Sequence, residues 1–152
     1  MSKLKLQNGD DHPAAAQRHL DDALVLNRAT RPDGAAYLAG YVVECSLKTL
    51  ILLETGVTTA HAHLPWRKGR DGHDLKVLAG QASSAAALAG AKTARYLGSA
   101  LTGFSTGPIA DWNPESRYRA PSVTQNVANA WLANAQVLYQ QTVGQMLLDG
   151  VL

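Results

Sequence analysis

Residues 32–55 read PDGAAYLAGYVVECSLKTLILLET, a stretch that is apolar over most of its length. Pro32 suits the first turn of a helix, and Asp33 suits the positive end of the helix dipole. Gly56 follows, and glycine is favoured just past a helix end because it adopts a left-handed backbone without strain. The stretch therefore predicts one helix from Pro32 to about Thr55, on the order of 35 Å long.

A narrow polar stripe runs along this expected helix, formed by Tyr37, Tyr41, Glu44 and Lys48. At 100° per residue the four side chains fall within roughly 60° of arc, and the remaining circumference is nearly all apolar. Two interpretations are open. The stripe is the solvent face, where the Glu44–Lys48 pair contributes only about 0.2–0.5 kcal/mol. Alternatively, the pair is partly buried and orients other groups in a cleft.

A helix that is apolar on nearly all sides needs apolar partners on nearly all sides. A few short helices from the same chain supply a limited area for this purpose. A homodimer interface is one way to cover the remainder, so we expect a homodimer.

Periodic apolar residues and capping signals predict further helices on both sides of this one. Residues 1–11 are expected to form a loose lead-in. The last helix is expected to begin with a capping box, Ser122 to Gln125. The expected helices besides 32–55 are 13–29, 73–88, 91–101 and 122–148.

No two strand-like runs are joined by a turn, and no alternation of strands and helices is present. The whole chain, residues 1–152, therefore predicts a single all-α domain. We expect a four- to five-helix up-and-down bundle with two long helices.

Composition narrows the class of protein. The chain has 152 residues, of which 46% are hydrophobic, so it is not a disordered segment. Its net charge of +2 is too small by itself to indicate nucleic-acid binding, which the positions of the basic residues have to indicate. The single cysteine, Cys45, excludes an intrachain disulfide, and the N-terminus has no continuous apolar stretch. The apolar run Leu50 to Leu53 is far too short to span a bilayer. We expect a cytoplasmic protein without a membrane partner.

The segment from Ala36 to Lys48 resembles the second-helix signature of HEPN domains, which are small four- to five-helix bundles. In many of them a Tyr-x-x-Glu-x-x-x-Lys pattern precedes a His-x-Leu segment, which here is His73-Asp74-Leu75. Trp112 and the pair Arg117-Tyr118, before the last helix, are also similar to the family. The resemblance covers about residues 13–148.

The resemblance implies a prokaryotic toxin–antitoxin or phage-defence setting, and binding or cleavage of RNA, or binding of a nucleotide. The usual catalytic element of such domains is an Arg followed, after four to six residues, by a His near the last long helix. No His follows Arg117 or Arg119, and Arg67 and His73 have a similar spacing in a different segment. The alternative is a non-catalytic interaction module that pairs with a nucleotidyltransferase-like or other defence protein.

Metal-free cleavage of RNA needs a base, an acid and a cation for the phosphoryl charge. His73 is the best base or acid, Arg117 or Arg119 can hold the phosphate, and Tyr118 can stack or donate. Glu44 and Lys48 would orient these groups, and Tyr37 and Tyr41 would contact the substrate. Other interpretations stay open: His73 bonds a backbone group, and the two arginines pair with Asp111, Glu115 or the carbonyl groups at the C-terminal end of a helix.

The long loop 57–72 carries Arg67 and Arg70 beside Trp66. Basic groups next to an aromatic ring suit RNA, although such a loop also serves as a solvated surface. His61 and His63 lack further convergent ligands in the sequence pattern, so we expect no metal site. No sequence signature predicts a cofactor.

Overall fold

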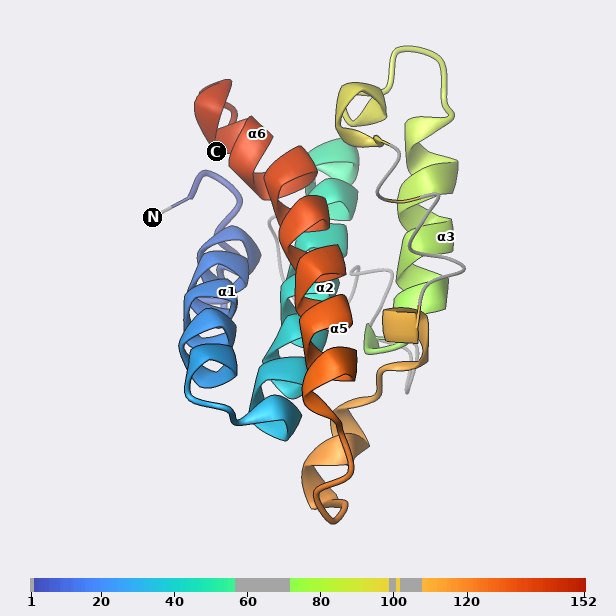
Figure 1. The fold of residues 1–152 in the computed structure, drawn as a ribbon. Helices are drawn as coiled ribbons and strands as arrows, with labels where there is room; N and C mark the ends of the chain where they lie inside the picture. Colours follow the sequence, from blue (N-terminus) through green and yellow to red (C-terminus); the bar gives the residue numbers. More distant parts are fainter. Residues whose placement is uncertain (1, 57–71, 99–100, 102–107) are drawn as a thin grey trace.

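The computed structural model describes residues 2–56, 72–98, 101 and 108–152. These residues form a helical bundle, and none of them lies in a strand, so the predicted all-α class is confirmed. Figure 1 shows the arrangement of the helices. Their bounds are α1 His12–Arg28, α2 Pro32–Thr55, α3 Leu75–Ala86, α5 Gln125–Tyr139 and α6 Gln145–Leu148.

Helix α2 is the centre of the bundle and contacts α1, α3 and α5. It begins at Pro32 and ends before Gly56, whose φ of 65° is the left-handed conformation predicted there. By length and composition alone α2 could cross a membrane. However, 78% of its apolar window is buried inside the structure, which is the situation of a core helix.

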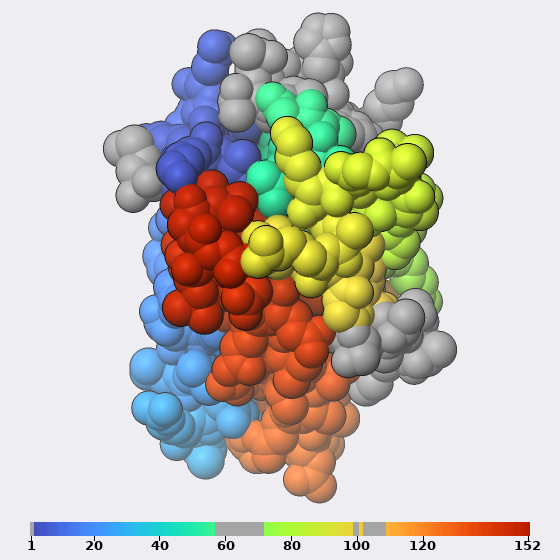
Figure 2. Space-filling view, turned by 90° about the horizontal axis from the view of Figure 1, so that it is seen from above, coloured from blue at the N-terminus to red at the C-terminus, as the bar shows by residue number. Residues whose placement is uncertain are grey.

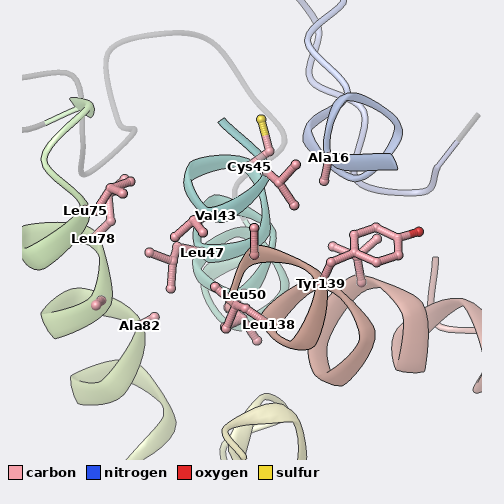
Figure 3. Close-up of a cluster of buried hydrophobic side chains, with 14 of the residues drawn as sticks. Ala16, Val43, Cys45, Leu47, Leu50, Leu75, Leu78, Ala82, Leu138 and Tyr139 are labelled. Atoms are coloured by element: carbon pink, nitrogen blue, oxygen red, sulfur yellow. The ribbon is translucent and has the colours of Figure 1, made fainter. Parts of the chain in front are cut away.

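The core surrounds α2 on several sides (Figure 3). Ala16 from α1, Leu47 from α2, Leu78 from α3 and Leu138 from α5 belong to one cluster of buried side chains. Because α2 is covered within the chain, its apolar circumference does not require a second copy. The homodimer stays a prediction, but the reason that the sequence suggested for it is wrong.

The N-terminal segment is packed, so the expectation of a loose lead-in is wrong. Leu4 and Leu6 are both buried in the core cluster. Lys3 Nζ donates a hydrogen bond to the carbonyl oxygen of Gly150 at 2.7 Å, which ties the two ends of the chain together. Figure 2 shows both ends on the same face of the molecule. These contacts link residues far apart in sequence, so no local pattern indicates them.

The last helix begins at Gln125, and its N-cap is Thr124, whose hydroxyl accepts the N–H of Val127 at 3.3 Å. The predicted capping box at Ser122 is therefore wrong. The N–H groups of Ser122 and Val123 instead donate to Asp33 Oδ1, at 2.9 and 3.0 Å. From α5 the chain continues through a π-helical turn, Gln140–Gly144, into α6, which ends at Leu148 as predicted.

The predicted helix 91–101 is also wrong over residues 91–98. Only a 3-10 turn, Ala94–Tyr96, forms there, whereas Leu101 is helical. Tertiary hydrogen bonds hold the segment in its irregular path: Thr93 donates to Glu54 Oε2 from its N–H and its hydroxyl, and Tyr96 donates to Asp149. These side-chain contacts outweigh the helix propensity of alanine. The helix predicted at 73–88 is confirmed as the slightly shorter α3.

Candidate functional site

Glu44 is the centre of a buried polar cluster on α2. Its carboxylate accepts a hydrogen bond from Lys48 Nζ at 2.7 Å and pairs through its other oxygen with His73 Nδ1 at 2.9 Å. Glu44 is only 4% exposed and Lys48 only 5% exposed. The interpretation of these two residues as part of a solvent face is therefore wrong, and the buried interpretation holds.

His73 is hydrogen-bonded through its Nδ1 atom, and about half of its side chain is exposed to solvent. A carboxylate can only accept, so Nδ1 carries the proton in this bond and Nε2 of the neutral ring is an acceptor. The side chain is 49% exposed, in contrast to its partner Glu44. An imidazole oriented by a carboxylate is the arrangement of a general acid or base. The bond to Glu44 replaces the backbone bond that was the alternative expectation for His73.

The start of α3 positions His73 against α2. Asp74 is the N-cap of α3, and its Oδ1 accepts the N–H groups of Lys76 and Val77 at 2.9 and 3.1 Å. Leu75, directly after it, is buried in the core. The turn that carries His73 is therefore anchored by a cap on one side and by the core on the other.

The other end of the stripe carries a chain of polar contacts. The hydroxyls of Tyr37 and Tyr41 lie 3.2 Å apart, and the guanidinium of Arg117 donates to Tyr37 Oη at 3.5 Å. Arg117 also lies over the ring of Tyr118, 4.7 Å from its centre. These contacts with Tyr37 and Tyr118 raise the pKa of Arg117, so it is a permanent cation. Burial, with the Tyr37 hydrogen bond, raises the pKa of Tyr41 and keeps its phenol protonated.

Arg117 and Arg119 are available to a ligand. The expected alternative was that they pair with Asp111 or Glu115. Among the described residues neither arginine forms such an ion pair, and Asp111 is paired with Lys76 at 2.7 Å. Both arginines are exposed, in or next to the 3-10 turn Pro114–Tyr118.

Trp112 covers the part of the stripe formed by Tyr37 and Tyr41. Its indole N–H donates to the carbonyl oxygen of Tyr37 at 3.1 Å, and its ring meets Tyr41 edge to face with centres 4.9 Å apart. The indole lies directly on Gly40, where an added Cβ would come within 2.1 Å of the ring. Glycine at this position therefore lets the tryptophan approach the backbone of α2.

Replacing Gly40 with alanine is expected to lower the free energy of unfolding by about 1–3 kcal/mol, because the indole has to move away from α2. Urea unfolding followed by circular dichroism measures this change. Gly80→Ala, in α3, is the matched control, since nothing lies within 4 Å of a Cβ there. The control should be neutral or stabilising by up to about 1 kcal/mol. Equal stability of the two variants would contradict the packing of Trp112 on Gly40.

Two pockets lie on either side of Trp112 and Asp111, which line both of them. The first has a volume of about 660 Å³ and includes His73. The second has a volume of about 410 Å³ and is lined by Arg117, Arg119 and aromatic side chains. The candidate base and the candidate phosphate ligands therefore lie in neighbouring pockets rather than in one.

The two pockets differ in charge. In the first, Asp74, Asp111 and Glu115 outnumber Lys76, so its lining is acidic when His73 is neutral. In the second, Arg117 and Arg119 balance Asp33 and Asp111, and Asp111 also pairs with Lys76. The second pocket therefore repels an anion less than the first, and the two arginines lie in it.

The contacts of Arg117 and His73 are separated along α2. Arg117 contacts Tyr37 and His73 contacts Glu44, seven residues further along the helix. At the rise of an α-helix, this is a separation of about 10 Å along the axis. The structure thus joins Glu44, Lys48 and His73 in one cluster, and Tyr37, Tyr41, Arg117 and Tyr118 in another, with Trp112 between them.

Several predicted candidates lie outside the described residues: Arg67 and Arg70, together with Trp66, His61 and His63. Within the described part of the chain, no three His, Cys, Asp or Glu side chains are grouped so that they could hold a metal ion. Cys45 is buried, and burial raises the pKa of its thiol to about 12. It is therefore not a ready nucleophile.

Three features of the two pockets and their surroundings were not predicted from the sequence. One is the ion pair between Lys76 and Asp111, and another is the contact of Trp112 with Gly40. A glycine inside an apolar helix often marks close packing, so Gly40 could have been singled out. His12 was also missed. It is mostly buried at the start of α1, where the charges of Lys48 and Glu44 influence its pKa.

No protein-family model, curated protein or solved structure matches this chain. The HEPN resemblance therefore rests on the residues themselves, chiefly Tyr41, Glu44, Lys48 and His73. A function has to be argued from the two pockets and the clusters beside them.

Proposed function

We propose that this chain is a HEPN-like cytoplasmic protein of a prokaryotic toxin–antitoxin or defence setting that binds RNA at the two pockets on either side of Trp112 and cleaves it. The observation that carries the proposal is the His73–Glu44 pair. It combines a buried, oriented carboxylate with a half-exposed imidazole that lines a pocket. The second pocket, on the other side of Trp112, supplies the cations.

The second pocket supports binding of a phosphate group. Arg117 and Arg119 offer planar guanidinium groups, which suit the oxygens of a phosphate. Tyr118 is 76% exposed and provides a free aromatic face beside Arg117. Unstacked bases of single-stranded RNA bind to such faces, which is why we favour single-stranded RNA or a nucleotide as the ligand.

The proposed reaction is transfer of the phosphodiester to the neighbouring 2′-hydroxyl. His73 Nε2 accepts the proton of that hydroxyl, and its oxygen forms a bond to phosphorus. The bond from phosphorus to the 5′-oxygen breaks, and this oxygen takes a proton from water. Arg117, in the neighbouring pocket, attracts the strand through another of its phosphates. The products are a 2′,3′-cyclic phosphate and a 5′-hydroxyl end.

A second candidate is the non-catalytic module that pairs with a nucleotidyltransferase-like protein. The observation that favours it is the separation of about 10 Å along α2 between the contacts of Arg117 and His73. The acidic lining around His73 points in the same direction, because it repels a phosphate.

The test uses a labelled single-stranded RNA with the parent protein, His73→Gln and Arg117→Gln. Binding is measured by fluorescence anisotropy, and cleavage by gel electrophoresis. We expect Arg117→Gln to weaken binding about tenfold, because one charge-assisted contact is lost. His73→Gln should bind normally and lose at least about tenfold in cleavage rate. Arg28→Gln is the matched control, since Arg28 is an exposed arginine at the end of α1.

Each result separates the candidates. Cleavage that survives both substitutions contradicts the catalytic role of these residues. Binding by the parent protein without cleavage contradicts catalysis and supports the paired module. If Arg117→Gln and Arg28→Gln reduce binding equally, the affinity is only general charge attraction and the second pocket is not the binding site.

A further inference from the structure

The pocket that His73 lines needs a cation of its own. If His73 takes the proton of the 2′-hydroxyl, the attacked phosphorus lies beside its Nε2 atom, inside the first pocket. The charge that develops on the phosphoryl oxygens is then compensated best from within that pocket. Arg117 contacts α2 at Tyr37, about 10 Å along the helix axis from the contact of His73. Arg117 is therefore too far away to serve this phosphate.

Lys76 is the only lysine or arginine among the described residues that line the first pocket. It lies in the first turn of α3, three positions after His73 in the chain. Its side chain is 58% exposed, so a ligand in the pocket can reach the ammonium group. One short segment therefore presents both an imidazole and a cation to the same pocket.

Asp111 orients the Lys76 side chain without using all of its donors. Asp111 lines the same pocket, and its Oδ1 accepts a hydrogen bond from Lys76 Nζ at 2.7 Å. An ammonium group has three N–H donors, so two are left for phosphoryl oxygens. The hydrogen bond and the charge of Asp111 raise the pKa of Lys76. Lys76 therefore stays a cation and is not suited to donate a proton to the leaving oxygen.

We propose that Lys76 is a catalytic residue, which contacts the phosphate under attack and stabilises the charge of its oxygens in the transition state. This inference rests on the proposed cleavage of RNA by His73. The 2′-oxygen bonds to phosphorus as His73 Nε2 takes its proton, and the bond to the 5′-oxygen breaks as that oxygen takes a proton from water. Lys76 keeps its own protons throughout and donates hydrogen bonds to the non-bridging oxygens.

A merely structural role is the alternative for Lys76. The Lys76–Asp111 pair joins α3 to the 3-10 turn Pro108–Asp111, and losing it could disturb the pocket. However, the two side chains are 58% and 77% exposed, and ion pairs as exposed as this one contribute little to stability. Variants of either residue should therefore fold, which allows the two roles to be separated by kinetics.

Steady-state cleavage of a labelled single-stranded RNA by the full chain tests the role of Lys76. We expect Lys76→Gln to lower kcat at least about tenfold and to change KM by less than about threefold, because the contact strengthens as charge develops on the phosphate. Lys76→Arg keeps the positive charge and should lose less than about threefold in kcat. Lys5→Gln is the matched control, since Lys5 is an exposed lysine that lines neither pocket.

Asp111→Ala distinguishes a contact with the phosphate from the structural ion pair. This variant loses the pair as completely as Lys76→Gln does, but it keeps the ammonium group and removes a carboxylate that repels phosphate. We expect it to retain at least about a third of the parent kcat, well above Lys76→Gln. Equal losses in Asp111→Ala and Lys76→Gln would assign Lys76 to the ion pair alone and overturn the proposal.

The remaining outcomes separate this inference from the proposed function. Circular dichroism should show all variants folded. If the parent and Lys76→Gln cleave at the same rate while His73→Gln is inactive, the role of Lys76 is overturned and the proposed function stands. If Lys76→Gln changes only KM, Lys76 contributes to binding and not to catalysis, which also overturns the proposal. A parent chain that does not cleave RNA contradicts the proposed function and this inference together.

Discussion

Glu44→Gln is expected to lower the free energy of unfolding by about 3–5 kcal/mol, the range for breaking a buried ion pair from one side. Lys48 is 5% exposed, and the carboxylate that accepts its hydrogen bond at 2.7 Å is replaced by a neutral amide. His73 loses the same partner. Urea unfolding at pH 7, followed by circular dichroism, measures the change.

Two further variants make this result specific. Glu115→Gln removes the charge of an exposed glutamate and should change the stability by no more than about 0.5 kcal/mol. Adding Lys48→Met to Glu44→Gln removes the buried cation and should recover part of the loss. If Glu44→Gln is as stable as Glu115→Gln, the buried pair does not contribute to the fold as we infer.

Acid is expected to destabilise the protein through His12, by about 3 kcal/mol between pH 6.5 and pH 4. Burial, with the nearby charge of Lys48, lowers the pKa of His12 from 6.5 to about 4. Between these two values the unfolded chain binds a proton that the folded chain does not bind, so a fall in pH favours unfolding. The contribution of His12 is complete above pH 6.5. It is lost at roughly 1.4 kcal/mol per pH unit down to pH 4.

The measurement compares the parent chain with His12→Gln in urea unfolding at pH 7 and pH 4. Other groups also titrate in acid, including His19, whose pKa burial lowers too. The difference between the two proteins isolates His12. We expect the variant to lose about 3 kcal/mol less than the parent over this interval. Equal losses in both proteins would show that His12 takes up its proton in the folded state without cost.

Helix α2 was predictable in detail because its signals are local. Pro32 and Gly56 mark its ends, and both act through the backbone conformation of a few neighbouring residues. The helix bounds predicted from the sequence are wrong where long-range contacts compete with local ones. Ser122 looks like a cap, yet its N–H donates to Asp33, and the helix begins later, at Gln125, with Thr124 as its N-cap.

The candidate site was predictable only in part. Helical periodicity brought Tyr37, Tyr41, Glu44 and Lys48 onto one face, and the family resemblance suggested His73 as a neighbour. The bond between Glu44 and His73 agrees with that suggestion. The position of Trp112 between two pockets could not be inferred, because it depends on how a distant turn packs on Gly40.

The amino-acid order is sufficient for the all-α class, the bounds of α2 and the alignment of its polar side chains, because helix geometry repeats within a few residues. It is not sufficient to say whether that polar face meets water. Burial of Glu44 and Lys48 depends on the segments that cover α2, and these come from distant parts of the chain. Tertiary packing therefore converted an ordinary i,i+4 pair into a buried carboxylate that holds His73 at the edge of a pocket.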